Sequence, residues 1–489
     1  MLNLNAIDLK KEKIDTLVVA VCEDKNIHDD PMINAMINQA LKLKEFKAEK
    51  SDDVTLYDLK GFNIKRIIFV GLGKFEKIEP EALRAFCGTA VKKAIKAGFE
   101  RIWIAVPAAE ILKMELTTTV GAMMEGACLG NHLFDKYKME KKKKPLKQIS
   151  FLVQADSMGK LKTVPRKISS ICAGTILARE WISTPSNDKT PEQFTRSIVS
   201  RARKHGLKIR VLREKELRQN KFGALLAVAA GSQSKPSLVV LEHRPANAKK
   251  TLALVGKGVT FDSGGLNIKT GGSMAGMKAD MSGAAVVAAT LFTLARLKTN
   301  VHVIGAMPIV ENMPSGKATR PGDIVRSYSG KTIEIGNTDA EGRLILIDAI
   351  SYVVKKYKPQ MMIDLATLTG ACRVALGVKI AGLFTRDDKL SQAIIASGGK
   401  THERCWPLPL PEDYKELLKS DFADINNISN TRWGGAITAA LFLSEFSGDT
   451  RWAHIDIAGP ATIEKEDAYC GPGGTGFGVR LLCDLIGRL

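Results

Sequence analysis

The chain has 489 residues, of which 45% are hydrophobic and 25% are charged, with a formal net charge of +20 at pH 7. This composition is ordinary for a soluble globular protein, and it excludes a chain too polar to bury a core. Because the length is too great for one hydrophobic core, we expect two domains.

The eight cysteines are scattered without a CxxC pair, and several lie in apolar runs. This pattern indicates reduced, buried thiols of a cytosolic protein, and argues against a disulfide framework or a zinc finger. The N-terminus has no apolar signal region, and no run approaches about 18 apolar residues. We therefore expect no signal peptide, no membrane span and a cytoplasmic location.

Residues 1–150 alternate between apolar strand patterns and helical patterns, which is typical of a layered, mostly parallel α/β domain. This N-terminal domain shows no catalytic cluster, and we expect it to be a variable domain with an oligomeric or regulatory role. Its expected strands cover residues 16–21, 66–73, 101–106 and 148–154, and its expected helices cover 32–43, 80–98 and 111–130.

A polar segment from about residue 134 to 147 is typical of a domain boundary. Residues 151–180 form a linker region with a helix near 167–181, and residues 181–489 form the C-terminal catalytic domain. The fold class is therefore α/β, with two domains that each hold a mixed or mostly parallel sheet flanked by helices. The second domain's expected strands are 207–212, 223–232, 237–244, 251–258, 301–310, 331–337, 360–368, 379–386 and 452–461.

The segment VGKGVTFDSGGLNIKTGGSMAGMKADMSG, from Val255 to Gly283, leaves an apolar strand pattern and breaks into glycine. Open α/β sheets bind ligands on such loops, and glycine lets the backbone approach a ligand closely. The loop carries charged residues that suggest a cation site beside an anion site. These residues are Lys257, Asp262, Lys269, Lys278 and Asp280.

A second segment, IGNTDAEGRLILIDAI, also runs from a strand pattern into a helix, and adds Asp339, Glu341 and Arg343. Four acids on two loops could hold two divalent metals, and oxygen ligands suit Mg²⁺ and Mn²⁺ and tolerate Zn²⁺. Such a pair could activate water and polarise a carbonyl or phosphoryl oxygen. No histidine lies in either loop, and Ser263 lacks a nucleophile elbow, so peptidase, phosphatase and amidohydrolase remain open.

Much of the positive charge gathers in RARKHGLKIRVLREKELRQNK, from Arg201 to Lys221, and in a shorter run at residues 138–147. Basic patches can bind nucleic acid, so binding through this surface is the alternative to an enzyme. A solvated helix face and a solvated linker explain the same runs. No aromatic residues interleave with either run, so stacking on bases is not indicated.

The octapeptide NTDAEGRL at residues 337–344 matches the signature of the leucyl aminopeptidase (cytosol aminopeptidase) family. The segments VGKGVTFDSGGLNIK, MKADMSGAA, NDKTPEQF, RPGDIV, DLATLTGA, HIDIAGPA and GTGFGVR also resemble that family in order and spacing. The resemblance covers residues 180–489 and extends more weakly to the N-terminal domain. It implies a metal-dependent aminopeptidase that acts on peptides and prefers leucine and other large apolar N-terminal residues.

The resemblance further implies a dinuclear metal site with Mn²⁺ or Zn²⁺, or Mg²⁺. Asp262 and Glu341 would bridge both ions, and Asp339 would complete one site. Lys257 and Asp280 would complete the other site. A lysine ligand must be neutral, and an adjacent dication lowers its pKa.

By the same resemblance, Lys269 and Arg343 are the catalytic residues. Lys269 would stabilise the oxygen that becomes negative, and Arg343 would hold a bicarbonate ion that acts as the general base. The family also implies a homo-hexamer. Thr270 stands where many relatives have proline and Ser282 where many have glycine, and neither residue supplies a ligand.

Overall fold

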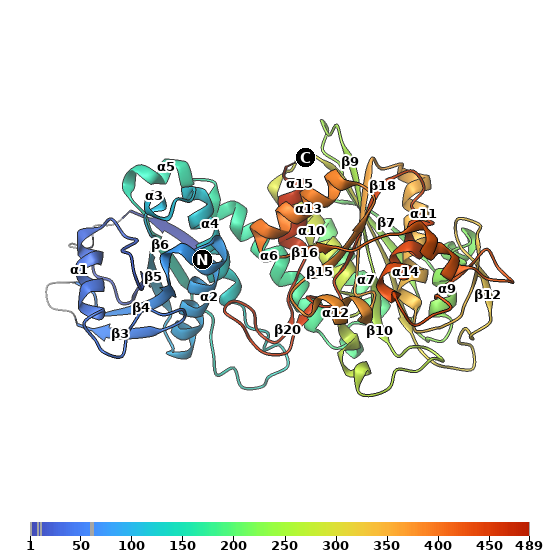
Figure 1. The fold of residues 1–489 in the computed structure, drawn as a ribbon, viewed down its shortest axis with the longest axis horizontal. Coiled ribbons are helices and arrows are strands. Elements are labelled where there is room, and N and C mark those ends of the chain that lie inside the picture. Colours follow the sequence, from blue (N-terminus) through green and yellow to red (C-terminus); the bar gives the residue numbers. More distant parts are fainter. Residues whose placement is uncertain (1, 7–8, 10–11, 59–62, 489) are drawn as a thin grey trace. The chain divides into compact units, whose positions relative to one another are not determined.

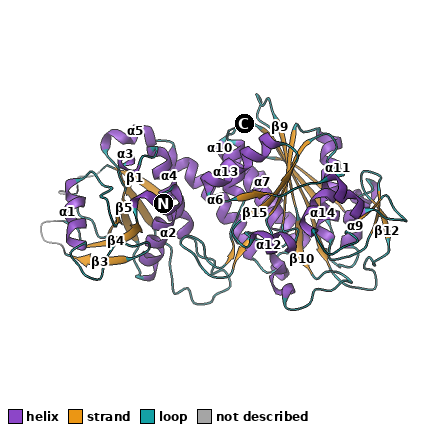
Figure 2. Ribbon diagram, viewed as in Figure 1, coloured by secondary structure: helices purple, strands orange, loops and turns teal. Residues whose placement is uncertain are grey.

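The computed structural model describes residues 2–6, 9, 12–58 and 63–488. The chain divides into two compact units, which Figures 1 and 2 trace in sequence colours and by secondary structure. Unit 1 comprises Met1–Cys172 with Lys465–Pro472, and unit 2 comprises Ala173–Glu464 with Gly473–Leu489. The expected α/β fold with two domains is confirmed.

Unit 1 contains a sheet with the strand order β1-β6-β5-β2-β4-β3. All neighbouring strands are parallel except β3, which pairs antiparallel with β4. The strands are β1 (Leu2–Asn5), β2 (Leu17–Cys22), β3 (Asp53–Tyr57), β4 (Arg66–Gly73), β5 (Arg101–Ala105) and β6 (Gln148–Leu152). The helices are α1 (Pro31–Ala40), α2 (Pro80–Lys96), α3 (Ala109–Leu112), α4 (Leu116–Gly130) and α5 (Met158–Leu161), and α6 (Val164–Ser183) follows them.

The prediction of a single helix at residues 111–130 is wrong, because the structure divides this region into α3 and α4. Lys113 follows α3 in the left-handed conformation, with φ at 54°. A residue in that conformation ends an α-helix, and the chain turns before α4 begins. The α3 helix is therefore only one turn long.

Unit 2 is organised around a mixed sheet with the order β16-β15-β18-β14-β9-β11-β8-β7, and β10 pairs with β11. The central strands β18, β14, β9 and β11 are parallel, and their burial on both faces explains their continuous apolar runs. The strands are β7 (Lys208–Arg213), β8 (Ser237–His243), β9 (Thr251–Gly256), β10 (Gly258–Asp262), β11 (His302–Asn312), β14 (Met361–Ala366), β15 (Ala381–Thr385), β16 (Cys405–Pro407) and β18 (Arg451–Asp456).

Helices cover both faces of this sheet, as Figure 2 shows. In one group α7 and α15 contact α10 and α13 contacts α15, and in the other α9 and α14 contact α11 and α12 contacts α14. The first group is α7 (Pro191–Lys204), α10 (Ser282–Leu297), α13 (Asp388–Thr401) and α15 (Val479–Ile486). The second group is α9 (Gly223–Ala229), α11 (Glu341–Tyr357), α12 (Gly370–Leu376) and α14 (Gly435–Ser444), and α8 (Glu214–Gln219) lies beside β7.

The expectation that no run is long and apolar enough to cross a membrane is wrong for one segment of the described chain, Ser273–Leu297. Its most apolar 18-residue window is 83% buried inside the protein, and α10 within it contacts β8, β9, β11 and β14. A helix that is apolar all round is expected in the core of a large sheet protein. Its hydropathy is explained by that burial.

The prediction of a strand at residues 223–232 is also wrong, because this segment forms α9. Its buried residues are Ala224, Leu225, Val228 and Ala229, which lie on one face of a helix. The segment is rich in alanine and leucine, which favour helix, and apolar residues in a short run do not separate the two structures by pattern alone.

The strand expected at residues 331–337 exists, but only as β13 (Thr332–Glu334) and outside the main sheet. It pairs with β12 (Ile324–Arg326) and β17 (Ile425–Asn426) in a small sheet. A further pair joins β19 (Thr462–Ile463) to β20 (Gly473–Gly474). The small sheet leads directly to the segment that carries Asp339 and Glu341.

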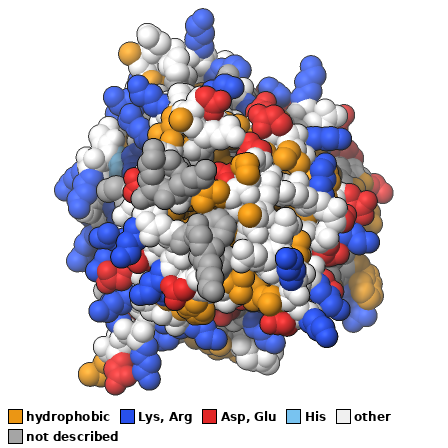
Figure 3. All heavy atoms as spheres, turned by 90° about the vertical axis from the view of Figure 1, so that its left-hand side faces the viewer, with side chains coloured by type: hydrophobic (Ala, Val, Ile, Leu, Met, Phe, Trp, Pro, Cys, Tyr) orange, Lys and Arg blue, Asp and Glu red, His pale blue; other side chains and the backbone are white. Residues whose placement is uncertain are grey.

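The basic segment 201–221 covers the end of α7, the strand β7 and α8. Because β7 lies at the end of the sheet order, its exposed Lys208, Arg210 and Arg213 fall on an edge strand. Charged side chains on an edge strand discourage pairing with another chain. Figure 3, which faces unit 1, shows Lys and Arg side chains interspersed with acidic and apolar ones on that unit.

Most of the cysteines are buried, as expected, and His302 and His454, in strands of the main sheet, each lie against a carboxylate. His454 Nδ1 lies 2.5 Å from Asp364 Oδ1, and His302 Nε2 lies 2.9 Å from Glu242 Oε1. Of the cysteines in the described part of the chain, all except Cys128 are buried. These residues therefore contribute to the core of the two units.

Candidate metal centre

The acidic residues lie where the strands of unit 2 end. Asp262 is the last residue of β10, and Glu341 is the first residue of α11. Asp280 follows a 3-10 helix at Ser273–Ala279 and stands just before α10. The expectation that all these charges lie on loops is therefore wrong for Asp262 and Glu341, which regular structure holds in place.

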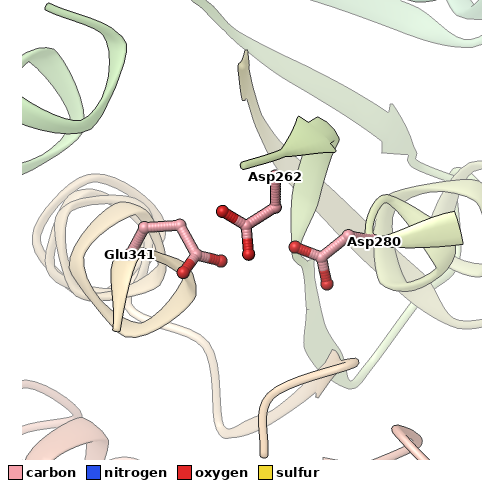
Figure 4. A group of neighbouring side chains, drawn as sticks. All are labelled: Asp262, Asp280 and Glu341. Atoms are coloured by element: carbon pink, nitrogen blue, oxygen red, sulfur yellow. The ribbon is translucent and has the colours of Figure 1, made fainter. Parts of the chain in front are cut away.

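Asp262, Asp280 and Glu341 converge on one point, as Figure 4 shows. Each offers a carboxylate oxygen, and these oxygens lie within 4.8 Å of one another. The three side chains are 1%, 5% and 2% exposed. Three buried carboxylates at this spacing repel one another unless positive charge lies between them.

Two lysines supply positive charge. The Nζ atom of Lys257 lies 2.9 Å from Asp280 Oδ1 and 2.8 Å from Glu341 Oε1. The Nζ atom of Lys269 lies 2.8 Å from Asp262 Oδ2 and 2.6 Å from Asp339 Oδ1. Asp339 is therefore connected to the acidic cluster through Lys269.

Burial and charge act in opposite directions on these groups. Burial raises the pKa of each of Asp262, Asp280 and Asp339 above the ordinary value of an aspartic acid, because burial penalises the charged form of the carboxyl. Burial lowers the pKa of Lys257, but the carboxylates of Asp280, Glu341 and Asp262 outweigh it, so this pKa is raised. The lysine is therefore protonated in this arrangement.

Two glycines leave room for these side chains. A Cβ atom on Gly342 would lie 2.5 Å from Lys257 Cε, so a larger residue would displace the lysine. Gly264 has φ at +90°, and a Cβ there would lie 2.3 Å from the carbonyl oxygen of Asn267. The glycines of the two motifs therefore admit Lys257 and allow the turn after Asp262.

Neutral residues that the sequence analysis missed orient the acids. Asn312 Nδ2 donates to Asp262 Oδ1 at 2.8 Å, and Thr367 Oγ1 donates to Asp280 Oδ1 at 2.7 Å. The carbonyl of Thr367 also accepts from Lys257 Nζ at 3.0 Å. Asn312 ends β11 and Thr367 follows β14, so their position at strand ends was the signal that could have found them.

Arg343 lies in the first turn of α11 and is buried. Its Nη1 donates to the carbonyl of Asn427 at 2.7 Å, and its Nε has no hydrogen-bond partner among the described residues. Burial lowers the pKa of Arg343 to about 10. The side chain thus provides a buried cation with hydrogen-bonding capacity left over for an anion.

The donor set fits divalent cations. Asp280 Oδ2 is buried and has no hydrogen-bond partner among the described residues, and all the converging acidic ligands are oxygens. A buried carboxylate oxygen without a donor is costly, and a cation would satisfy it. Hard ions such as Mg²⁺ and Mn²⁺ prefer this set, and Zn²⁺ also accepts it.

The fold and this site together define an α/β protein with a metal-binding centre at the ends of its sheet strands. Residues 176–483 match the catalytic domain of the cytosol aminopeptidase family, and residues 9–141 match the family's N-terminal domain. The chain belongs to the cytosol aminopeptidase family. It is therefore a metal-dependent aminopeptidase, a hydrolase that removes residues from the N-termini of peptides.

Full-length relatives support this assignment. The chain is 40% identical over 494 residues to a probable cytosol aminopeptidase of Chlorobium phaeobacteroides, covering 98% of this chain and 97% of the relative. It is 41% identical over 462 residues to one of Geobacter sp., covering 94% and 93%. Among solved structures it is similar to the bottromycin maturation enzyme BotP in complex with Mn, with a TM-score of 0.86, 32% identity and coverage of 97% and 99%.

Proposed function

We propose that this chain is a leucyl aminopeptidase that uses two divalent cations to release N-terminal residues, preferring leucine and other large apolar ones. The observation that carries the proposal is the convergence of Asp262, Asp280 and Glu341 within 4.8 Å. Lys269 connects Asp339 to the same cluster.

Each proposed ligand is assigned to one or both of the two ion sites. Asp262 and Glu341 would serve as ligands to both ions, Asp339 would complete one site, and Lys257 and Asp280 would complete the other. These residues would hold Mn²⁺ or Zn²⁺, with Mg²⁺ as a further candidate, and the Mn complex of BotP supports manganese. The unpartnered Asp280 Oδ2 supports a cation on that side of the cluster.

When bound, the two cations supply an activated water and polarise the scissile carbonyl. Lys269 has its ammonium group between Asp262 and Asp339, where it stabilises negative charge that develops on the carbonyl oxygen. Arg343 would hold a bicarbonate anion, which would supply the general base. The unpartnered Nε of Arg343 supports that role, because it leaves a charged donor for an anion.

Recognition of the N-terminus follows from the same charges. With cations held by the acidic cluster, the free α-amino group of a peptide would bind there, and this would restrict cleavage to the first peptide bond. The proposed preference for leucine, homo-hexameric assembly and cytoplasmic location are supported by membership of the cytosol aminopeptidase family. Peptides are accordingly the partners we propose for the catalytic centre.

The proposal is tested by hydrolysis of leucine p-nitroanilide with added Mn²⁺, compared with a panel of other aminoacyl p-nitroanilides. We expect Asp280→Asn to lower turnover by about 10²-fold or more, because it removes a charged ligand. Asp388→Asn changes an exposed acid of unit 2 and is the matched control. Unchanged turnover in Asp280→Asn, or no preference for leucine, would contradict the corresponding part of the proposal.

A further inference from the structure

Asp280 follows a segment of unit 2, residues 270–279, that is loosely packed. This segment is mostly exposed, and a Cβ atom at Gly271, Gly272 or Gly276 would meet nothing within 4 Å. Exposed backbone with few packing contacts is held weakly. The position of the segment therefore depends on the hydrogen bonds that tie it to the rest of unit 2.

One side chain supplies such a bond. Lys189 Nζ donates to the carbonyl oxygen of Lys278 at 2.7 Å and to that of Trp181, in α6, also at 2.7 Å. In the described chain the other hydrogen bonds of the segment reach no further than Ser282. Because Lys278 stands two residues before Asp280, Lys189 holds the backbone that leads to this carboxylate.

Lys189 is an unfavourable residue for this place in the fold. Its side chain is buried, and no acidic side chain of the described chain pairs with it. Burial, together with the charge of Lys278, lowers the pKa of Lys189 to about 7. A neutral amine keeps two N–H groups, so both bonds to carbonyl oxygens persist whether or not the side chain is protonated. A buried amine without a carboxylate is costly, which indicates that these bonds serve more than the fold.

The same turn of the chain also holds the strand that ends at Asp262. Ser186 Oγ donates to the carbonyl oxygen of Thr260 at 2.8 Å. The register of β10 against β11 shifts just before Asp262, and such an irregularity leaves backbone groups without partners in the sheet. Ser186 therefore satisfies a carbonyl two residues before the second acid of the cluster.

We propose that Lys189 is a positioning residue of the metal centre. With Ser186 it sets the separation of the carboxylates that Asp262 and Asp280 direct at one point, as Figure 4 shows. Each side chain holds a carbonyl two residues before one of these acids, and both lie in the turn that leads from α6 to α7. The inference rests on the proposed two-cation function, and it assigns Lys189 no contact with the cations.

The test compares Lys189→Met with the unmodified protein by calorimetric titration of the metal-free full chain with Mn²⁺. Methionine is flexible and suits a buried site, but it cannot donate to the two carbonyl oxygens. We expect Mn²⁺ affinity to fall about tenfold at one of the two sites, as for other groups that orient metal ligands. Lys204→Met changes an exposed lysine at the end of α7 and is the matched control, with unchanged affinity.

Two further measurements separate positioning from a purely structural role. The denaturant midpoint of metal-free Lys189→Met should match or exceed that of the unmodified protein, because the variant removes a buried amine that lacks an acidic partner. In electron paramagnetic resonance, the variant with Mn²⁺ added should show a larger share of signal from single ions than from coupled pairs. Loss of affinity with a matching loss of stability in the metal-free protein would assign Lys189 to the fold and overturn the proposal.

Ser186→Ala keeps the proposal testable if Lys189→Met does not fold. It removes one hydrogen bond from a partly exposed side chain and should weaken Mn²⁺ binding about two- to fivefold, with Ser200→Ala in α7 as the matched control. Equal Mn²⁺ binding by Lys189→Met, or by Ser186→Ala where that variant alone folds, and the unmodified protein would overturn this inference alone. Failure of the unmodified protein to bind Mn²⁺ would overturn the proposed function, and this inference with it.

Discussion

Lys257 and Glu341 form a buried ion pair at the centre of the catalytic unit, with Nζ and Oε1 2.8 Å apart. The pair joins the end of β9 to the first residue of α11. It exists because residue 342 is glycine, since a Cβ there would lie 2.5 Å from Lys257 Cε. The packing of one glycine therefore controls the position of a charged group in the metal centre.

Gly342→Ala should disable the centre without disrupting α11. Alanine favours helix over glycine by about 1 kcal/mol, so the helix itself gains, whereas Lys257 must move away from Glu341. We expect turnover of leucine p-nitroanilide to fall by about tenfold or more, with the helical circular dichroism signal retained. Gly399→Ala is the matched control, because Gly399 lies in α13 and a Cβ there would meet nothing within 4 Å. Equal activity of the two variants would show that the position of Lys257 is unimportant.

Lys257→Met should reduce the number of protons that leave the protein when the metal binds. The pKa of Lys257 is raised by its carboxylate neighbours, so the amine must lose a proton before it can bind a cation. Cation affinity should accordingly rise with pH, and the variant should release about one proton fewer per centre. Calorimetry with Mn²⁺ in buffers of different ionisation enthalpy measures this number. The same proton release in both proteins would exclude Lys257 as a ligand.

Much of this centre could be predicted before the structure, because chain leaving parallel strands reaches one edge of a sheet. That rule brought together Asp262 and Asp280 with Glu341, which lies about sixty residues further along the chain. The glycines and charged residues of the two segments indicated which loops form the site. Three of the four expected acids converge in the structure, whereas Asp339 is connected to them through Lys269.

The supporting hydrogen bonds could not be predicted in the same way. Thr367 reaches Lys257 because β14 pairs with β9, although about a hundred residues separate these strands in the chain. Strand order is decided by the packing of the whole sheet, and local patterns do not specify it. The prediction of a strand where α9 lies was wrong for a related reason, because a short apolar run is compatible with both a strand and a helix until its neighbours are known.

Arg343→Ala should leave metal binding intact and slow turnover by about 10²- to 10³-fold, the range for loss of one charged stabilising group. Turnover of the unmodified protein should depend on added bicarbonate in buffer freed of carbon dioxide, whereas the variant should not respond. Metal content measured beside the rates separates this result from loss of the cations. A variant that keeps the bicarbonate response would contradict the anion-holding role of Arg343.

Glu341→Gln should lose both metal and rate, because the proposed bridging carboxylate loses its charge at two ions together. Metal analysis after dialysis against buffer without chelator should show less bound Mn²⁺ than in Arg343→Ala. The two variants lie in the same turn of α11, so they serve as controls for each other. If Glu341→Gln kept its full metal content, a bridging role for Glu341 would be excluded.

Asp348 should make the folded protein less stable as the pH rises towards 8. Its carboxylate is fully buried in α11 and accepts from the backbone N–H groups of Leu225 at 2.9 Å and Tyr328 at 2.7 Å. Burial raises the pKa of Asp348 to about 7 despite these bonds. A carboxyl whose pKa is raised on folding contributes stability below its unfolded pKa of about 4, and this contribution is lost as the pH rises through about 7.

Asp348→Asn removes this titration, because the amide is neutral at every pH, and it keeps one oxygen as an acceptor. We expect the free energy of unfolding of the original protein to fall between pH 5 and pH 8 by about 3 kcal/mol more than that of the variant, because about two pKa units of the shift lie in this range and each corresponds to about 1.4 kcal/mol. Denaturant midpoints of both proteins across this range measure the difference. Parallel pH profiles would mean that Asp348 stays ionised in the folded state, and that the two backbone donors compensate its burial in full.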